Sequence, residues 1–417
     1  MPIEHLRGLL ALPVLLALAW LLGERRGRVR WRTVLGGVGL QLALAALLIG
    51  VPPAARAIYA LNSVATALQD ATDAGTAFVF GYLGGGPLPF AETHPGATFI
   101  LAFKALPLVL TISALASLLF HWGVLQRVTA VFAWGLRRTL GLGGALSLGA
   151  AVHIFLGMIE APLLIRPWLA RMQRGELFAL MSCGMAGVAG TVMVIYASVL
   201  GPVVPNALGN ILIASVISTP AALAIAELMV PFGPGDDAAE IAPEHRAASS
   251  LDALVRGTMD GLAPLVGIAS VLLVTVAFVA LINMALAHLP EWGGAPVTLQ
   301  AIFALPMRPL VWLIGLPWGE SAVGATLMST KTVLNEFLSY LQMAGLPEGA
   351  LSSRGRVVMT YAMCGFANFG SLGILTGGLS TMIPERRAEV VALGWRSMIS
   401  GTLATLSSGA VAGVMSG

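Results

Sequence analysis

Two glutamates stand inside apolar stretches of the chain, and a charge in the centre of a bilayer costs several kcal/mol unless a polar partner or a water-filled cavity receives it. Glu160 is preceded by Gly157 and followed by Pro162, and Glu336 follows Lys331. Glycine and proline interrupt helices and leave backbone N–H and C=O groups free for a solute or an ion. We therefore predict that both acids belong to a binding site. The alternative is a structural ion pair, for instance with Lys331.

Two segments near these acids resemble each other. One begins Cys183-Gly184-Met185-Ala186, the other begins Cys364-Gly365-Phe366-Ala367, and they start 181 residues apart (364 − 183). The spacing from Gln126 to Glu160 is 34 residues, and that from Gln300 to Glu336 is 36. Repeated, interrupted apolar segments indicate a transporter built from two copies, here 96–231 and 257–415. A hairpin that enters and leaves on one side, plus three crossings per copy, predicts an inverted repeat.

The elements that must position these residues are membrane-spanning helices. The chain is 57% hydrophobic and 10% charged, whereas soluble domains carry roughly 25% charged residues. Runs of about 20 apolar residues are long enough to cross a bilayer. We predict an all-α polytopic membrane protein with two re-entrant hairpins, interfacial helices and eight transmembrane helices, over residues 8–23, 33–52, 96–121, 176–201, 207–231, 257–289, 357–382 and 389–415.

Composition also limits the partners. A net charge of +3 with arginines placed in loops favours a role in topology over nucleic-acid binding. We expect contact with membrane lipid, no nucleic acid, no cofactor and no resident metal, since no His/Cys/Asp/Glu cluster has metal-ligand spacing. The segment 9–22 is followed at once by basic residues and is interpreted as a retained span.

Arginine placement predicts the orientation. The basic stretch from Arg25 to Arg32 is expected on the cytoplasmic side of the inner (plasma) membrane. Counting spans onward places the 233–256 loop inside and both termini outside, on the periplasmic or extracellular side. Arg354 and Arg356 then fall on the side that arginines usually avoid.

Four stretches resemble the concentrative nucleoside transporters, in order and over essentially the whole chain. They are Phe155–Pro167, Gly315–Glu320, Thr330–Phe337 and Cys364–Ser371. The resemblance implies a homotrimer and elevator-type symport of nucleosides driven by sodium or protons. It also implies a scaffold and a mobile transport domain. The boundaries we expect are 1–122 (scaffold spans), 123–232 (first transport half), 233–256 (linker), 257–297 (scaffold span) and 298–417 (second transport half).

The resemblance places the ribose on Glu336, Asn368 and Ser371, with Phe366 near the nucleoside. The chemistry of these groups agrees with that assignment. Ribose offers vicinal hydroxyls, a carboxylate accepts from them, and amide and hydroxyl groups can donate or accept. Hydrogen bonds to charged groups contribute about 1.5–3 kcal/mol, so Glu336 is expected to dominate the affinity for the sugar. The alternative for Asn368 and Ser371 is hydrogen bonding between helices.

The first hairpin departs from the family pattern. The family has Gln and Thr or Ser where this chain has Met158 and Ile159, so Glu160 alone remains to meet a polar base edge. The positions that supply sodium ligands in the family are His153 and Gly187, together with the backbone carbonyls of Leu156 and Val188. Imidazole is a poor sodium ligand but titrates near neutral pH. We predict proton coupling through His153 or Glu160, with a space-filling neutral His153 as the alternative.

Other classes of protein could use the same residues and the same scaffold. His153 and Glu160 on one hairpin could support acid–base catalysis in a membrane-embedded enzyme. No activated nucleophile or metal set accompanies them, so we expect no enzyme. A passive channel, a receptor, or a transporter of another small polar solute would use the same scaffold, and accumulation against a gradient separates a symporter from the first two.

Overall fold

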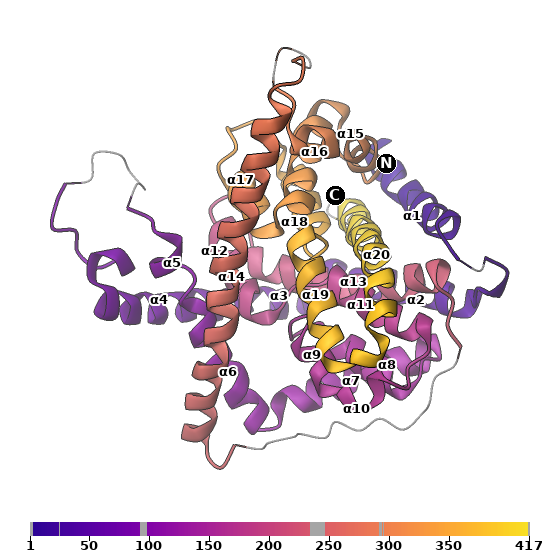
Figure 1. Cartoon of the computed structure of the whole chain (residues 1–417), viewed down its shortest axis with the longest axis horizontal. Coiled ribbons are helices and arrows are strands. Elements are labelled where there is room, and N and C mark those ends of the chain that lie inside the picture. Colours follow the sequence, from indigo (N-terminus) through magenta and orange to yellow (C-terminus); the bar gives the residue numbers. More distant parts are fainter. Residues whose placement is uncertain are drawn as a thin grey trace.

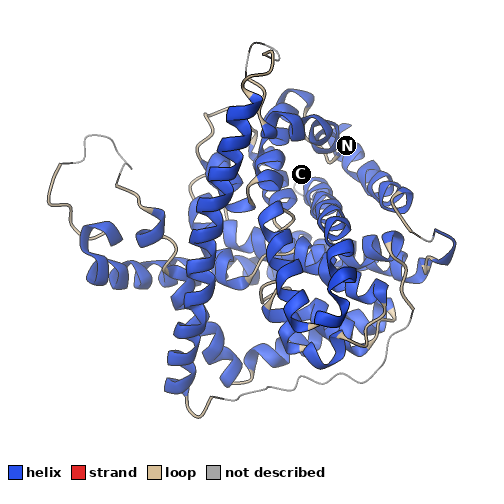
Figure 2. Ribbon diagram, viewed as in Figure 1, coloured by secondary structure: helices blue, strands red, loops and turns tan. Residues whose placement is uncertain are grey.

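The computed structural model describes residues 3–24, 26–91, 98–233, 247–291, 294 and 296–415. In these ranges the chain is helical, with no strand (Figures 1 and 2). The predicted all-α class is therefore confirmed for the described residues. Most of the 233–256 segment, expected to be a linker, and Arg25 of the basic stretch lie outside the described residues.

Among the residues that the structure describes, six stretches of helix are long and apolar enough to cross a membrane, two fewer than the eight predicted from sequence. They are α2 (Trp31–Gly50), α5–α6 (Leu101–Lys104 and Leu108–His121), α11–α12 (Arg174–Ala186 and Gly190–Leu200), α13 (Ala207–Met229), α14 (Ser250–Leu286) and η3–α20 (Pro384–Arg386 and Arg387–Met415).

The two remaining predicted spans differ for identifiable reasons. The 8–23 span is α1 (Ile3–Leu21), whose apolar part, Arg7–Leu21, is shorter than a full crossing and contains Pro13. The 357–382 span is two helices, α18 (Ser353–Met363) and α19 (Phe369–Met382), because the helix breaks between them. The mean hydropathy of a stretch of residues stays high across such a break, so apolar length alone predicts one continuous span.

Shorter helices complete the fold. Four amphipathic helices have the character expected of interfacial helices, namely α3 (Pro52–Tyr59), α4 (Leu61–Phe80), α7 (Val124–Leu140) and α15 (Leu299–Leu313). Two 3₁₀ turns, η1 (Arg26–Arg28) and η2 (Gly81–Gly84), join neighbouring elements. Figure 1 shows α4 and α5 extending to one side of the helical body.

Two pairs of helices pack against each other across short breaks at the places where hairpins were expected. In the first, α8 (Gly144–Val152) packs on α9 (Glu160–Leu164), which α10 (Arg166–Leu169) follows. In the second, α16 (Trp318–Val333) packs on α17 (Glu336–Ala344). The Asn335 side chain caps α17 by accepting from the Leu338 N–H at 2.9 Å. Each glutamate therefore begins the second helix of its pair.

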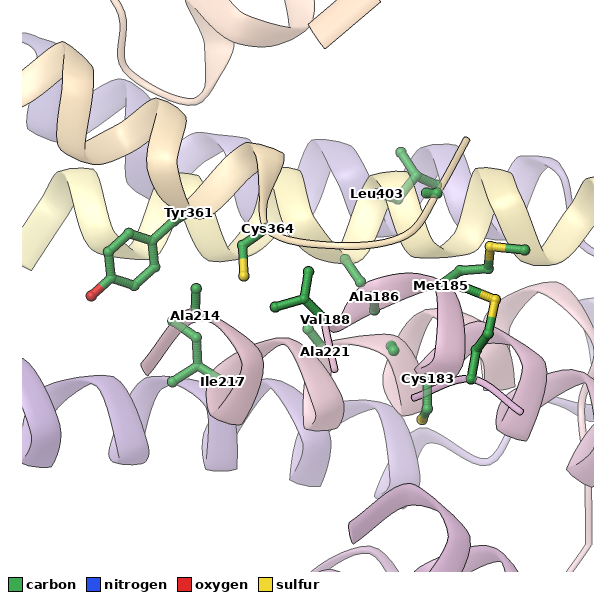
Figure 3. Packing of buried hydrophobic residues seen from close by; sticks show 14 of the residues in the cluster. Cys183, Met185, Ala186, Val188, Ala214, Ile217, Ala221, Tyr361, Cys364 and Leu403 are labelled. Atoms are coloured by element: carbon green, nitrogen blue, oxygen red, sulfur yellow. The ribbon is translucent and has the colours of Figure 1, made fainter. Parts of the chain in front are cut away.

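A helix breaks directly after Cys183–Ala186 and again from Cys364 onward, and the two breaks meet in the core. One break separates α11 from α12, and the other separates α18 from α19. The Phe366 N–H donates to the Gly187 carbonyl at 3.2 Å, so each break satisfies backbone groups of the other. Figure 3 shows Cys364 beside Val188 and Ala186 in the apolar packing around this junction.

The long helices fall into two packing groups. Helix α14 packs on α6, where Gly257 and Gly261 face Ser113 and Ser117. Helices α1 and α2 instead pack on α13 and α20. Ser407 donates to the Gln41 amide oxygen at 2.9 Å, which joins α2 to α20 inside the core. Because the bond is buried, α2 is held firmly to the second group.

Gly365→Ala tests the junction of the two breaks. A Cβ at Gly365 would lie 2.8 Å from the Met185 carbonyl oxygen, and overpacking of this kind costs about 1–3 kcal/mol. We expect a lower midpoint of thermal unfolding for the purified protein. The matched control is Gly373→Ala in α19, where a Cβ meets nothing within 4 Å and the midpoint should not fall. Equal behaviour of the two variants would contradict the packing described.

Candidate functional site

The Glu336 carboxylate is the centre of the candidate site. It lies in the first turn of α17, and only 3% of the residue is exposed. The Tyr196 hydroxyl of α12 donates to Oε1 at 2.6 Å, and the Asn368 amide donates to Oε2 at 2.9 Å. Both oxygens of a buried carboxylate are thus met by uncharged donors, which is the requirement for keeping such a group inside a protein.

The Asn368 side chain forms a second hydrogen bond, which fixes its orientation. It is the N-cap of α19, and its Oδ1 accepts from the backbone N–H of Ser371 at 2.7 Å. With the carbonyl occupied in this way, the NH₂ group must point to Glu336. Ser371 is buried one turn into α19, and half-buried Phe366 lies in the break just before it. The structure therefore gathers Glu336, Asn368, Ser371 and Phe366 around one pair of helix ends.

Lys331, in the last turn of α16, is a second buried charged residue. It is fully buried, and its ammonium group donates to the Thr405 hydroxyl at 3.3 Å. Its charge interacts with that of Glu336, yet within the described chain no Lys331–Glu336 contact shorter than 4 Å occurs. The alternative of a direct ion pair is therefore wrong for Glu336 in this arrangement, and the partners of the carboxylate are the uncharged Tyr196 and Asn368.

Glu160 faces a different space. It is exposed and lines a cavity of about 950 Å³ whose walls come from α6, α7, α12 and α14 as well as the first hairpin. Its carboxylate folds over Gly157, which leaves no room for a side chain there. Leu156 lines the same cavity, whereas Glu336 does not. The two glutamates thus do not share one wall in this structure.

Met158 and Ile159 pack into spaces that glycines leave open. Met158 is buried with its Cβ against Gly184 of α11, and the Ile159 side chain contacts Gly378 of α19. Both side chains therefore contribute apolar packing between the first hairpin and the broken helices. A polar residue at either place would need a partner that these glycines do not supply.

His153 is buried in the same way. Only 3% of it is exposed, its ring lies against Gly184, and its carbonyl faces Gly187. The Nε2 atom is buried and has no hydrogen-bond partner in the described part of the chain. Val188 is buried beside it in the break. No group of three His, Cys, Asp or Glu residues among those described could hold a metal ion.

Tyr196 is the site residue that sequence reasoning missed. It is the one tyrosine in the apolar run of α12, and it packs against Tyr340 at a centroid distance of 5.3 Å. Buried tyrosine hydroxyls nearly always have a partner, so a lone tyrosine in an apolar span could have been flagged. The sequence could not identify its partner, Glu336, which lies 140 residues further along the chain.

Comparison with known families covers nearly the whole chain. Residues 10–83 match the family model described as the Na+ dependent nucleoside transporter N-terminus. Residues 210–413 match the model for its C-terminus. Residues 102–203, which carry the first hairpin and the first break, match a model described as nucleoside recognition.

Individual relatives are similar over their full length or a large part of it. An uncharacterized transporter of Haemophilus influenzae is 37% identical, covering 99% of this chain and 98% of that protein. Nucleoside permease NupC of Helicobacter pylori is 29% identical over 99% of this chain and 98% of its own. Human solute carrier family 28 member 3 is 32% identical over 96% of this chain, which spans 58% of that longer protein.

Solved structures agree with the fold. The inward-facing, substrate-bound structure of CNTnw superposes with a TM-score of 0.89 at 35% identity, covering 99% of both chains. An outward-facing variant of CNTnw gives a TM-score of 0.90 at 35% identity, covering 100% of this chain and 98% of that one.

Thiol labelling tests the geometry of the first hairpin. The two native cysteines, Cys183 and Cys364, are buried and should stay unreactive toward a hydrophilic maleimide. Glu160→Cys should react, because residue 160 is exposed in the cavity. Met158→Cys, two residues away and buried, is the matched control and should not react. Equal labelling of the two variants would contradict the described orientation of the hairpin.

Proposed function

The chain belongs to the concentrative nucleoside transporter family, and we propose that it imports nucleosides or nucleoside-like solutes across the inner membrane by secondary active symport. It is a nucleoside transporter of that family and not an enzyme. The observation that carries the proposal is the Glu336 carboxylate held by Tyr196 and Asn368 at the meeting point of two helix ends.

In the proposed site Glu336 and Asn368 hold the sugar. The carboxylate accepts from two neutral donors, and a ribose hydroxyl can replace the Asn368 amide or share an oxygen with it. Desolvation strengthens such a bond, because water does not compete for the carboxylate in a buried site. Ser371 adds a hydroxyl on the first turn of α19.

The base is proposed to lie between Phe366 and the first hairpin. Phe366 is half-buried at the break and offers an aromatic surface for a heteroaromatic ring. Met158 and Ile159 are engaged in packing against glycines, so Glu160 is the polar group left on this side. This composition favours bases with few polar edge groups, since unpaired heteroatoms cost roughly 1–3 kcal/mol each.

The coupling ion is proposed to be a proton, although the matching family models are named for sodium dependence. His153 lies where the family resemblance expects an oxygen ligand, and Gly187 offers no side chain. The Nε2 atom of His153 has no hydrogen-bond partner in the described part of the chain, so it is available to accept a proton. The carbonyls of Leu156 and Val188 alone would leave sodium with few ligands.

The movement is proposed to be of the elevator type, within a homotrimer. Helices α6 and α14 are candidates for the scaffold, because they pack on each other and leave most of α14 exposed. The contacts of α1 and α2 with α13 and α20 favour their moving with the transport domain, although both were first assigned to the scaffold. Gly8 of α1 lies beside Val414 of α20, which fits both termini on one side, proposed as the outside.

Glu336→Gln and Asn368→Ala test the sugar site. Glu336→Gln removes the charge of the acceptor and replaces one of its oxygens by an NH₂ donor, whereas Asn368→Ala removes the amide donor. Hydrogen bonds to charged groups contribute about 1.5–3 kcal/mol. We expect uridine to bind about 10- to 150-fold more weakly, measured by isothermal titration calorimetry on purified protein.

Glu320→Gln is the matched control for these variants. Glu320 contacts Ser352 at the start of α18, away from the site, so its neutralisation should leave uridine affinity unchanged. Unchanged affinity in Glu336→Gln as well would show that this carboxylate does not hold the ligand.

Separate ion gradients in proteoliposomes test the coupling. We expect an inward proton gradient to drive uridine accumulation without sodium, and His153→Asn to abolish this stimulation. His121→Asn, which alters a histidine that lines the cavity at α6, is the control and should keep it. Strict dependence of the wild-type protein on sodium would refute proton coupling.

A further inference from the structure

A second cavity lies where α4, α5 and α6 approach α12 and α17. Its volume is about 300 Å³, which is at the lower limit of small-molecule pockets. The lining includes Gln69, Thr72, Asp73 and Lys104 on one side and Ser198 and Leu341 on the other. None of these residues lines the 950 Å³ cavity at Glu160. The second cavity is therefore a separate space.

Three polar groups of this cavity have no partner in the described part of the chain. The side chains of Gln69, Asp73 and Lys104 form no hydrogen bond and no ion pair there, although the charges of Asp73 and Lys104 interact over a longer distance. Thr72, by contrast, is satisfied by Leu68 and Thr111. The Asp73 carboxylate, the Lys104 ammonium group and the Gln69 amide thus line the cavity, and their hydrogen-bonding capacity is open to a ligand.

The chemistry of the lining defines the ligand class. The Asp73 carboxylate can accept from hydroxyl groups, and the Lys104 ammonium can donate to a carbonyl or a ring nitrogen. Asp73 and Lys104 carry opposite charges, so a charged ligand would be attracted by one of them and repelled by the other. A neutral ligand is therefore favoured. Phe99, Val199 and Leu341 supply an apolar wall for a ring. A neutral heteroaromatic ring that carries hydroxyl groups meets all of these conditions.

The cavity shares two helices with the transport site. Ser198 is two residues beyond Tyr196 on α12, and Leu341 is one turn and a half beyond Glu336 on α17. The opposite wall comes from α4 and from α6, which packs on α14. Helix α12, on the first side, packs on α13 of the second packing group. An occupant would therefore contact α6 of the first group and a helix that packs on the second group, and its binding would depend on how the two groups are arranged.

We propose that this cavity is a second nucleoside-binding site, distinct from the Glu336 site, whose occupancy holds the two groups of helices in their present arrangement. The proposal rests on the proposed function, because it takes the same class of ligand. Such a site would slow the exchange of substrate at high nucleoside concentration, since the bridging ligand must leave before the groups can move.

Equilibrium binding of radiolabelled uridine to the purified full-length protein tests the proposal. We expect two classes of sites in the wild-type protein. Glu336→Gln should weaken one class and leave the other. Adding Asp73→Asn or Lys104→Met to Glu336→Gln should weaken the remaining class about tenfold or more, because each removes a charge-assisted hydrogen bond.

Asp70→Asn in the same background is the matched control. Asp70 is exposed on α4, three residues before Asp73, and does not line the cavity, so the residual class should be unchanged. Size-exclusion profiles and thermal unfolding midpoints equal to those of Glu336→Gln would exclude misfolding of the variants.

The outcomes separate this proposal from the proposed function. A single class of sites that Glu336→Gln removes would overturn the second site and support the transport site. A residual class that ignores both Asp73→Asn and Lys104→Met would also overturn the second site. Absence of any uridine binding to the wild-type protein would refute the proposed function, and the second nucleoside site with it.

Discussion

The rest of the structure depends on the burial of the Glu336 carboxylate. A charge removed from water needs donors placed around it, and here they come from α12 and from the break before α19. Neither could reach the carboxylate if the helices that carry them ran unbroken through the core. The two breaks, joined by the Phe366–Gly187 backbone bond, are therefore what makes a polar site possible inside an apolar body.

Local sequence signals predicted the parts of the site that depend on local rules. A glutamate after a Lys-Thr-Val-Leu-Asn stretch and a Cys-Gly break before Asn368 indicate polar groups at helix ends, and the structure has them there. The Tyr196–Glu336 bond and the packing of α2 on α20 depend on long-range contacts. Hydropathy cannot reveal these, because both partners lie in apolar runs.

The first hairpin shows a different limit of sequence reasoning. Met158 and Ile159 look like lost polar functions when the chain is compared with the family pattern. In the structure they fill spaces left by glycines, namely Gly184 and Gly378. Arg354 is explained similarly, because its guanidinium donates to the Gly315 and Gly413 carbonyls near the ends of α15 and α20. A need to cap helix ends thus accounts for the position of this arginine independently of the charge rule used to predict the orientation of the spans.

The central claim is that the Glu336 carboxylate recognises the sugar hydroxyls of a nucleoside. The most direct test compares the affinities of uridine, 2′-deoxyuridine and 3′-deoxyuridine in the wild-type protein and in Glu336→Gln. We expect the wild-type protein to discriminate against at least one deoxynucleoside by about tenfold or more, and Glu336→Gln to lose most of that discrimination. Equal discrimination in both proteins would contradict this claim, because the hydroxyls would then be recognised by other groups.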